Sequence, residues 1–253
     1  MDILYKKAKA LISYSHLVIK DKEYEIVALC IHHESDVLHK TKRQRSGTWH
    51  ISFYNPTEGK NKKYIDIDMS DLSSIFRLRI EAIRDKKTGD IIAPAGKVYD
   101  EIRFSISDSN LLKYSREKIS KNSTPKLYLK KSNIVNKRKQ YIIPRRLGNT
   151  NKARYLDCVT SYLDPLMVTN DLSWFAHKDI QAKVISLYIL KKYGVENYDS
   201  NMIPIKKLKK YAIMFDEGKK MTKSQIDIEY KRNSKHTMYV LRCMGFYRER
   251  VFK

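Results

Sequence analysis

Asp66 and Asp68 are the residues whose type and spacing best fit catalysis. They lie in the segment 63–69, where apolar residues alternate with the two carboxylates as in a β-strand. Both carboxylates would therefore project from one strand face, as the metal site of a divalent-metal nuclease requires. The lysine that such a site places two residues after an acid on a neighbouring strand does not occur in clean form. We therefore favour a polar strand face that balances the surrounding lysines, with the nuclease as an alternative.

A second group, His32, Asp36 and His39, has metal-ligating side chains within the stretch HHESDVLH. On a helix these three positions would share one face. His32 directly follows a predicted strand at 24–31, however, which favours a histidine-rich loop near nucleic acid over a metal site. The sequence contains no HNH, GIY-YIG, Walker-type or GxGxxG motif, and no recognisable Ser/His/Asp or Cys/His arrangement. We accordingly predict no catalytic residues, no metal and no cofactor.

The charge of the chain is its strongest functional signal. Fifty-one lysines and arginines face 28 acidic residues over 253 positions, a formal net charge of +23. Self-repulsion on that scale is explained by a polyanionic partner. No apolar run approaches the ~18 residues of a spanning helix, and the N-terminus has no signal-peptide core. Nucleic acid is therefore favoured over a membrane surface.

The cysteines indicate a compartment. Cys30, Cys158 and Cys243 are odd in number and widely separated, so they form neither a disulfide framework nor a CxxC metal pair. A reducing cytoplasm fits this usage best.

The window 113–154 carries much of the excess charge, with fourteen lysines and arginines and one acidic residue, Glu117. Pro125, Pro144 and Gly148 interrupt it. We interpret it as a basic connector with some strand content lying along a polyanion, the alternative being a solvated linker. The loop 40–45 is a second basic stretch, for which an ordinary solvated loop is equally plausible. The candidate phosphate contacts in these two stretches are Lys130, Lys131, Lys137, Arg138, Lys139, Arg145, Arg146, Lys42, Arg43 and Arg45.

The C-terminal stretch 222–247 predicts two short helices. Thr222 can cap the first, and Gln225 three residues later completes a capping box. Ile226 and Tyr230 then fall on one face. Residues 231–233 interrupt the apolar pattern.

The second helix of this stretch would be capped by Ser234 and would end at Gly245. Its inward stripe comprises Met238, Leu241 and Met244. The pair resembles the helix-turn-helix units of phage and mobile-element regulators and of recombinase tails, with residues 237–239 matching a segment of the recognition helix. The resemblance implies that the second helix enters the major groove. The side chains then available to bases and phosphates are Lys235, His236, Tyr239 and Arg242.

The pattern along the chain predicts an α+β protein in three parts. Residues 1–112 form a β-rich domain with a mainly antiparallel sheet, residues 113–154 the basic connector, and residues 155–253 a helical bundle ending in the helix-turn-helix-like unit. The predicted strands are 24–31, 48–54, 63–69, 77–83 and 98–106, with 48–54 and 63–69 pairing as a hairpin with a long loop. The predicted helices of the bundle are 155–167, 178–193 and 205–215, with the two tail helices after them.

These observations predict a cytoplasmic nucleic-acid-binding protein, with DNA favoured over RNA. Its most concrete form is a duplex-DNA-binding regulator, or a replication or transcription accessory factor, of a phage or mobile element. One alternative is a metal-dependent nuclease whose N-terminal domain is catalytic. Another is an RNA-binding ribonucleoprotein subunit whose tyrosines stack on unpaired bases. Protein partners and a homodimer stay open.

Overall fold

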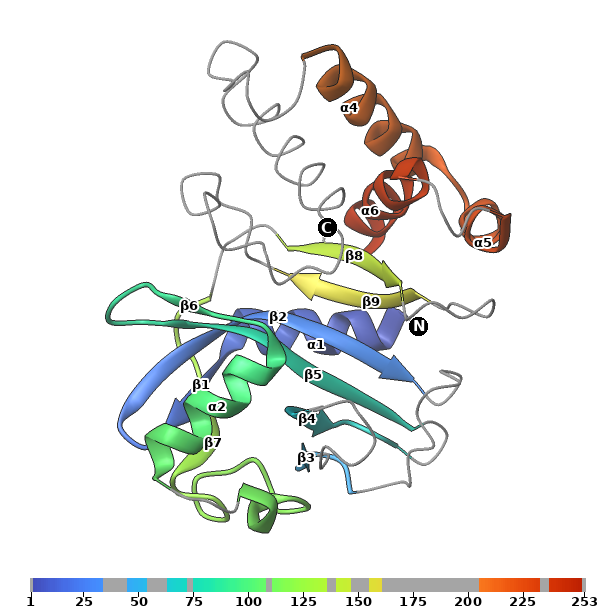
Figure 1. The fold of residues 1–253 in the computed structure, drawn as a ribbon. Coiled ribbons are helices and arrows are strands. Elements are labelled where there is room, and N and C mark those ends of the chain that lie inside the picture. Colours follow the sequence, from blue (N-terminus) through green and yellow to red (C-terminus); the bar gives the residue numbers. More distant parts are fainter. Residues whose placement is uncertain are drawn as a thin grey trace. The chain divides into compact units, whose positions relative to one another are not determined.

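A computed structural model divides the chain into two compact units, residues 1–137 and 138–253 (Figure 1). The fold is α+β, with a mainly antiparallel sheet in the first unit and helices in the C-terminal part. The structure describes residues 2–33, 45–53, 63–71, 75–107, 111–135, 140–146, 155–160, 205–232 and 237–251.

The first unit contains two α-helices, a short 3-10 helix and seven strands among its described residues. In chain order these are α1 (Asp2–Tyr14), β1 (Ser15–Ile19), β2 (Lys22–His33), β3 (Thr48–Phe53), β4 (Lys63–Asp68), β5 (Phe76–Asp85), β6 (Ile91–Ile92), α2 (Ala95–Ile106), η2 (Leu111–Tyr114) and β7 (Leu127–Lys131). The predicted strands at 24–31, 48–54, 63–69 and 77–83 are confirmed as β2, β3, β4 and β5. β3 and β4 pair as the predicted hairpin.

The strands of the first unit follow the order β3-β4-β5-β2-β1-β7, all antiparallel, with β6 added to β5. The sheet curls until its two ends are linked through one residue, Ile119. The Ile119 N–H donates to the Gly47 carbonyl at 3.0 Å, while its own carbonyl accepts from the Leu129 N–H at 2.9 Å. The buried Trp49 indole of β3 also donates to the Leu127 carbonyl of β7 at 3.2 Å. These bonds cover edges that would otherwise expose unpaired backbone groups.

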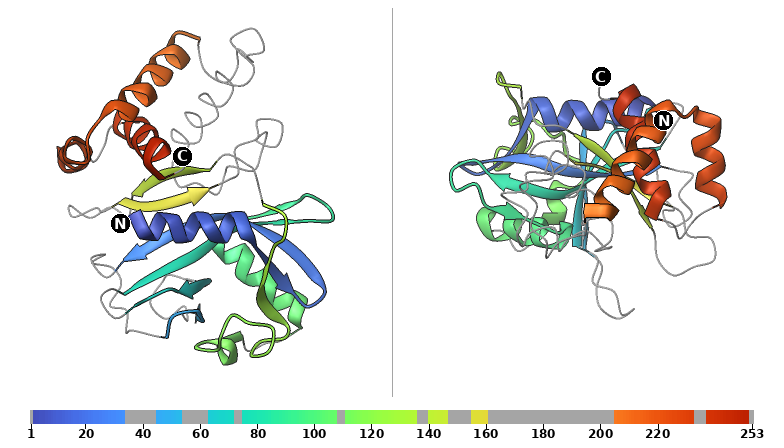
Figure 2. Two further views of the ribbon diagram at one scale, coloured as in Figure 1. Left: turned by 180° about the vertical axis from the view of Figure 1, so that it is seen from behind. Right: turned by 90° about the horizontal axis from the view of Figure 1, so that it is seen from above.

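Helices α1 and α2 lie on opposite faces of the curled sheet (Figure 2, right). α2 contacts β1, β4, β5 and β6, so the sheet curls around it. Its buried residues Val98, Tyr99, Ile102 and Ile106 recur at helical spacing. The predicted strand at 98–106 is therefore wrong. Its β-branched and aromatic residues favour a strand locally, but one apolar stripe packed against the sheet decides for a helix.

The second unit has a hairpin and three helices among its described residues: β8 (Tyr141–Arg146), β9 (Tyr155–Thr160), α4 (Ile205–Lys220), α5 (Lys223–Arg232) and α6 (Thr237–Val251). β8 and β9 pair antiparallel from Tyr141–Thr160 to Arg146–Tyr155. The predicted helix at 155–167 is thus wrong over residues 155–160, because pairing with β8 outweighs the local helical pattern. The predicted helix at 178–193 lies outside the described residues.

α4 and α6 cross at two glycines. A Cβ added at Gly218 would lie 2.0 Å from the Arg242 carbonyl oxygen, and one added at Gly245 would lie 1.9 Å from that of Phe215. Two predictions are corrected here. α4 does not end at 215 but continues to Lys220, and Gly245 lies inside α6 and does not end it. Both of these helical positions are glycine because the backbone of the partner helix occupies the space that a side chain would need.

The predicted capping box of α5 is confirmed. The Thr222 N–H donates to Gln225 Oε1 at 2.7 Å, and the Gln225 N–H donates to Thr222 Oγ1 at 3.3 Å. Ile226, Leu241 and Met244 are buried as predicted, while Ser234 lies outside the described residues. None of the helices in the described part of the chain has the length and apolar character needed to cross a membrane.

Candidate nucleic-acid interface and a buried charged cluster

Polar side chains form two rows across four strands of the first unit, which we call the charged rows. The strand register aligns His50, Asp66, Arg79 and Cys30 in one row, and Thr48, Asp68, Arg77 and His32 in the other. The rows are two residues apart on every strand, so they lie on the same face of the sheet. Asp66 and Asp68 thus share a face, as their alternation predicts.

Asp68 is fully buried and its two oxygens have separate partners. Oδ2 accepts from Arg77 Nε at 3.1 Å, and Oδ1 accepts from the Ser70 backbone N–H at 3.0 Å. Arg77 is buried as well. A buried carboxylate needs such compensation, because burial of an unpaired charge is strongly unfavourable.

Asp66 forms the corresponding pair with Arg79. Its two oxygens accept from Arg79 Nε at 2.9 Å and from Nη2 at 3.5 Å. Burial opposes ionisation of Asp66, but the Arg79 guanidinium and the nearby His32 outweigh it and hold the pKa of this carboxyl below its usual value. The guanidinium also lies 3.7 Å from the centroid of the Tyr64 ring.

His50 lies at the end of the first row, beside Asp66. Burial, reinforced by the charge of Arg77, lowers the pKa of its imidazole, and the charges of Asp66 and Asp68 only partly offset this. The imidazole is therefore neutral near pH 7. Its ring centroid is 6.3 Å from that of Tyr64, which extends the polar cluster toward solvent.

The two carboxylates proposed for a nuclease site are thus arginine counter-ions in this arrangement. To ligate a metal they would first have to exchange these partners. Among the described residues, no three His, Cys, Asp or Glu side chains are grouped to hold a metal ion. His32 belongs to the second row, whereas Asp36 and His39 lie outside the described residues.

Residues 111–126, which we call the basic segment, run antiparallel beside β3. The Trp49 N–H donates to the Glu117 carbonyl at 2.9 Å, and the Arg116 N–H donates to the Trp49 carbonyl at 2.7 Å. Thr124 is buried, and its hydroxyl accepts from the Trp49 indole at 3.3 Å. The first half of the predicted connector is therefore packed on the sheet of the first unit.

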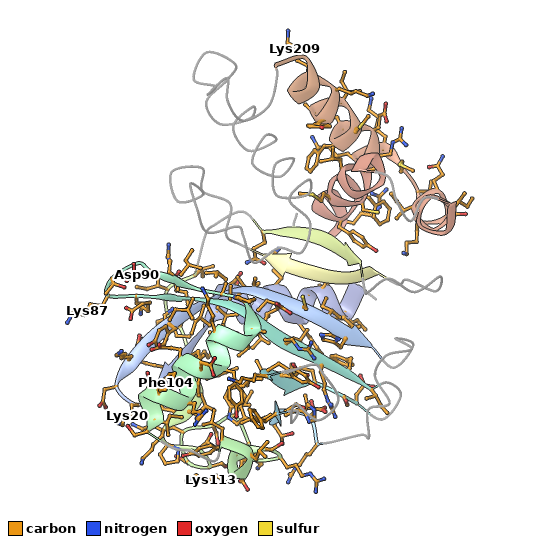
Figure 3. The ribbon with its side chains drawn as sticks, viewed as in Figure 1. Lys20, Lys87, Asp90, Phe104, Lys113 and Lys209 are labelled. Carbon is orange, nitrogen blue, oxygen red and sulfur yellow. The ribbon has the colours of Figure 1, made fainter. Side chains whose placement is uncertain are left out.

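Besides Lys113, four cations of the basic segment are exposed: Arg116, Lys118, Lys121 and Lys126. Within the described ranges no carboxylate pairs with any of them. The Lys20 N–H donates to the Lys126 carbonyl at 2.9 Å, which brings a further lysine to this part of the unit. Figure 3 shows Lys113, at the start of the segment, well away from Lys87.

The predicted phosphate contacts of β7 differ from one another. Lys131 is exposed, whereas Lys130 donates to Glu23 at 2.5 Å, and Glu23 also accepts from Lys86 at 2.7 Å. The hydrogen bonds from Lys130 and Lys86 lower the pKa of Glu23 to about 2. Lys130 is therefore partly neutralised, while Arg45, just before β3, is exposed.

In the second unit, Arg242 donates from Nε to Glu217 of α4 at 2.9 Å. All residues of α6 from Leu241 to Tyr247 are buried except Arg242, so this stretch is central to the unit. Tyr239 lies in the first turn of α6.

The structure leaves several other predicted contacts open. Arg145 and Arg146 are the last residues of β8. The candidates Lys42, Arg43, Lys137, Arg138, Lys139, Lys235 and His236 lie outside the described residues.

Sequence reasoning missed the arginines of the charged rows, although a signal was present. Arg77 and Arg79 alternate with Leu78 and Ile80 as the two aspartates alternate with isoleucines in 65–68. Matching the period-2 patterns of opposite charge would have paired the two strands.

Comparison with known protein families and with curated protein sequences finds no match for this chain.

Proposed function

We propose that this chain is a nucleic-acid-binding protein and that the basic segment is its main phosphate-contacting surface. Arg116, Lys118, Lys121 and Lys126 carry the proposal, because they are exposed and have no carboxylate partner among the described residues. Each such cation that neutralises a phosphate releases condensed counterions, a sequence-independent source of affinity. The formal net charge of +23 supports the same conclusion.

Several charged groups elsewhere in the first unit pair with one another, unlike the exposed cations of the basic segment. The charged rows neutralise themselves through arginine–aspartate pairs, and Glu23 partly neutralises Lys86 and Lys130. The basic segment has one acidic residue, Glu117, which is exposed. A segment whose backbone is hydrogen-bonded to β3 and whose cations are exposed suits an extended polyanion better than a small acidic ligand.

For the target we propose duplex DNA over RNA, with the second unit contributing sequence preference. The support is the resemblance of 222–247 to helix-turn-helix units, together with the capping box of α5 and the buried stripe of α6. A phage or mobile-element regulator, or an accessory factor of replication or transcription, is the role that combines these features.

The test of the phosphate surface is the salt dependence of duplex binding by an Arg116→Gln, Lys118→Gln, Lys121→Gln variant. We expect weaker binding to all sequences alike, and a log–log salt slope reduced by about 0.9 per lost contact. The matched control is Lys6→Gln, Lys87→Gln, Lys97→Gln, which removes the same charge from exposed positions elsewhere in the unit. Equal losses in the two variants would show that net charge alone acts and would overturn the assignment.

Sequence preference is tested separately with Arg242→Ala. If α6 reads duplex DNA, this variant narrows the affinity ratio between preferred and random duplexes while leaving the salt slope nearly unchanged. A uniform loss for all duplexes would instead show that Arg242 acts through its pair with Glu217 on the packing of α4 and α6.

A further inference from the structure

The end of β3 presents an aromatic ring to solvent. Phe53 is 43% exposed, and its ring centroid lies 6.1 Å from that of Tyr99 with an interplanar angle of 24°. Tyr99 belongs to α2 and is only 3% exposed. The Phe53 ring is thus supported by a buried ring and leaves other surface open, which is the geometry of a stacking platform.

Two elements near the end of β3 carry cations. η2 packs against β3 and carries Lys113, whose side chain is exposed. On α2, Arg103 lies one helical turn after Tyr99, on the same side of the helix. The basic segment continues from Lys113 along the same strand through Arg116.

We propose that Phe53 is a stacking site for an unpaired nucleobase, whose strand lies with its phosphates along the basic segment. Aromatic platforms beside cationic grooves bind single strands because every base has a π-face and every linkage a charge. Bases in a duplex are stacked on one another and offer no free face. The proposal rests on the proposed function, and it adds that the basic segment binds an unpaired strand as well as a duplex.

Phe104 provides the contrast that makes the proposal specific. It is 73% exposed on α2, more than Phe53, yet no aromatic ring among the described residues stacks on it. Figure 3 shows it on α2, apart from Lys113. If exposed aromatic area alone bound nucleic acid, Phe104 would contribute more than Phe53.

The experiment measures binding of labelled oligothymidine and oligouridine of about 12 nucleotides, a length suited to one groove, and of a duplex, by fluorescence anisotropy. The variants are Phe53→Leu, Phe53→Tyr and Phe104→Leu, each checked for an unchanged thermal midpoint. We expect Phe53→Leu to weaken single-strand binding about tenfold, within the range of one stacked base, and to leave duplex binding unchanged. Phe53→Tyr and Phe104→Leu should bind as the wild type does.

Two results for Phe53→Leu would overturn the stacking site: a single-strand affinity equal to that of the wild type, or equal losses of affinity for single strand and duplex. Neither result would overturn the proposed function. Absence of binding to all three probes by the wild-type protein would overturn the proposed function, and the stacking site with it. The oligothymidine and oligouridine arms show whether the unpaired strand is DNA or RNA.

Discussion

The charged rows and the basic segment are both rich in charge, but they differ in what surrounds each charge. In the rows, antiparallel register sets each aspartate beside an arginine. Asp66, Asp68 and Arg77 are buried, and the Arg79 side chain is 13% exposed. In the basic segment the backbone is held to β3 while the cations extend into solvent. The same residue types therefore serve the fold in one region and are available to a ligand in the other. Burial and pairing make this difference, since they determine whether a charge is already neutralised.

The largest expected effect concerns the charged rows. Asp66→Asn leaves the Arg79 guanidinium buried without its counter-ion, so we expect the free energy of unfolding to fall by about 3–5 kcal/mol. Urea denaturation followed by circular dichroism measures this. As a control, Asp66→Leu combined with Arg79→Met removes both charges and should cost much less, because no buried charge is left unpaired.

The nuclease alternative makes the opposite prediction for the same aspartate. It requires Asp66→Asn to keep its stability while losing cleavage of plasmid DNA with Mg²⁺ or Mn²⁺. That result would show that Asp66 serves catalysis and that its pairing with Arg79 does not stabilise the fold.

The second effect compares two helical glycines, one against the backbone of a neighbouring helix and one without such a close neighbour. Gly245→Ala places a methyl group against the Phe215 carbonyl and forces α4 and α6 apart, at an expected cost of about 1–3 kcal/mol. In α2, the nearest atom to a Cβ at Gly96 is 4.0 Å away, so Gly96→Ala should stabilise by about 0.4–1 kcal/mol. Thermal unfolding of both variants provides the comparison; a similar response in both would contradict it.

A smaller effect is expected at Glu23, whose ion pairs with Lys86 and Lys130 are on the surface. Its pKa of about 2 in the fold is below the ordinary value of 4.5, so the pairs stabilise the fold above pH 4.5. That contribution is lost as the pH falls from 4.5 toward 2. We expect Glu23→Gln to destabilise by less than about 1 kcal/mol at pH 7, and the difference from wild type to disappear near pH 2. Unfolding measured across this range decides it; a difference that grows at low pH would refute the pairing.

The smallest effect on stability is expected in the basic segment. The Arg116→Gln, Lys118→Gln, Lys121→Gln variant should unfold within about 0.5 kcal/mol of the wild type, because these side chains are exposed and have no carboxylate partner among the described residues. Chemical denaturation at low salt is the measurement. A loss comparable to that of Asp66→Asn would mean that these cations hold the segment on β3.

Local pattern predicted much of this protein correctly. Four strands followed from period-2 alternation and β-branched content, and the start of α5 followed from Thr222 and Gln225. The predictions for residues 98–106 and 155–160 were wrong because each stretch contains signals for both helix and strand. Packing or pairing with another segment decided between the two. Val98 and Ile102 became helical against the curled sheet, while Tyr155 became a strand residue opposite Arg146.

The candidate sites show the same division. Composition alone indicated a polyanionic partner, and the position of the basic window indicated a region for it. Neither could show that Lys130 is engaged by Glu23, which lies 107 positions away, or that Arg242 is paired with Glu217.

The sequence by itself determined the α+β class, the excess of positive charge, the shared face of Asp66 and Asp68 and the cap of α5. The charge follows from composition, and the others depend on residues within a few positions of one another. Only the tertiary structure decided which charges are neutralised, which glycines lie at a helix crossing, and that Ile119 joins the two ends of the sheet. Those outcomes depend on strand register and burial, which arise when distant segments pack together.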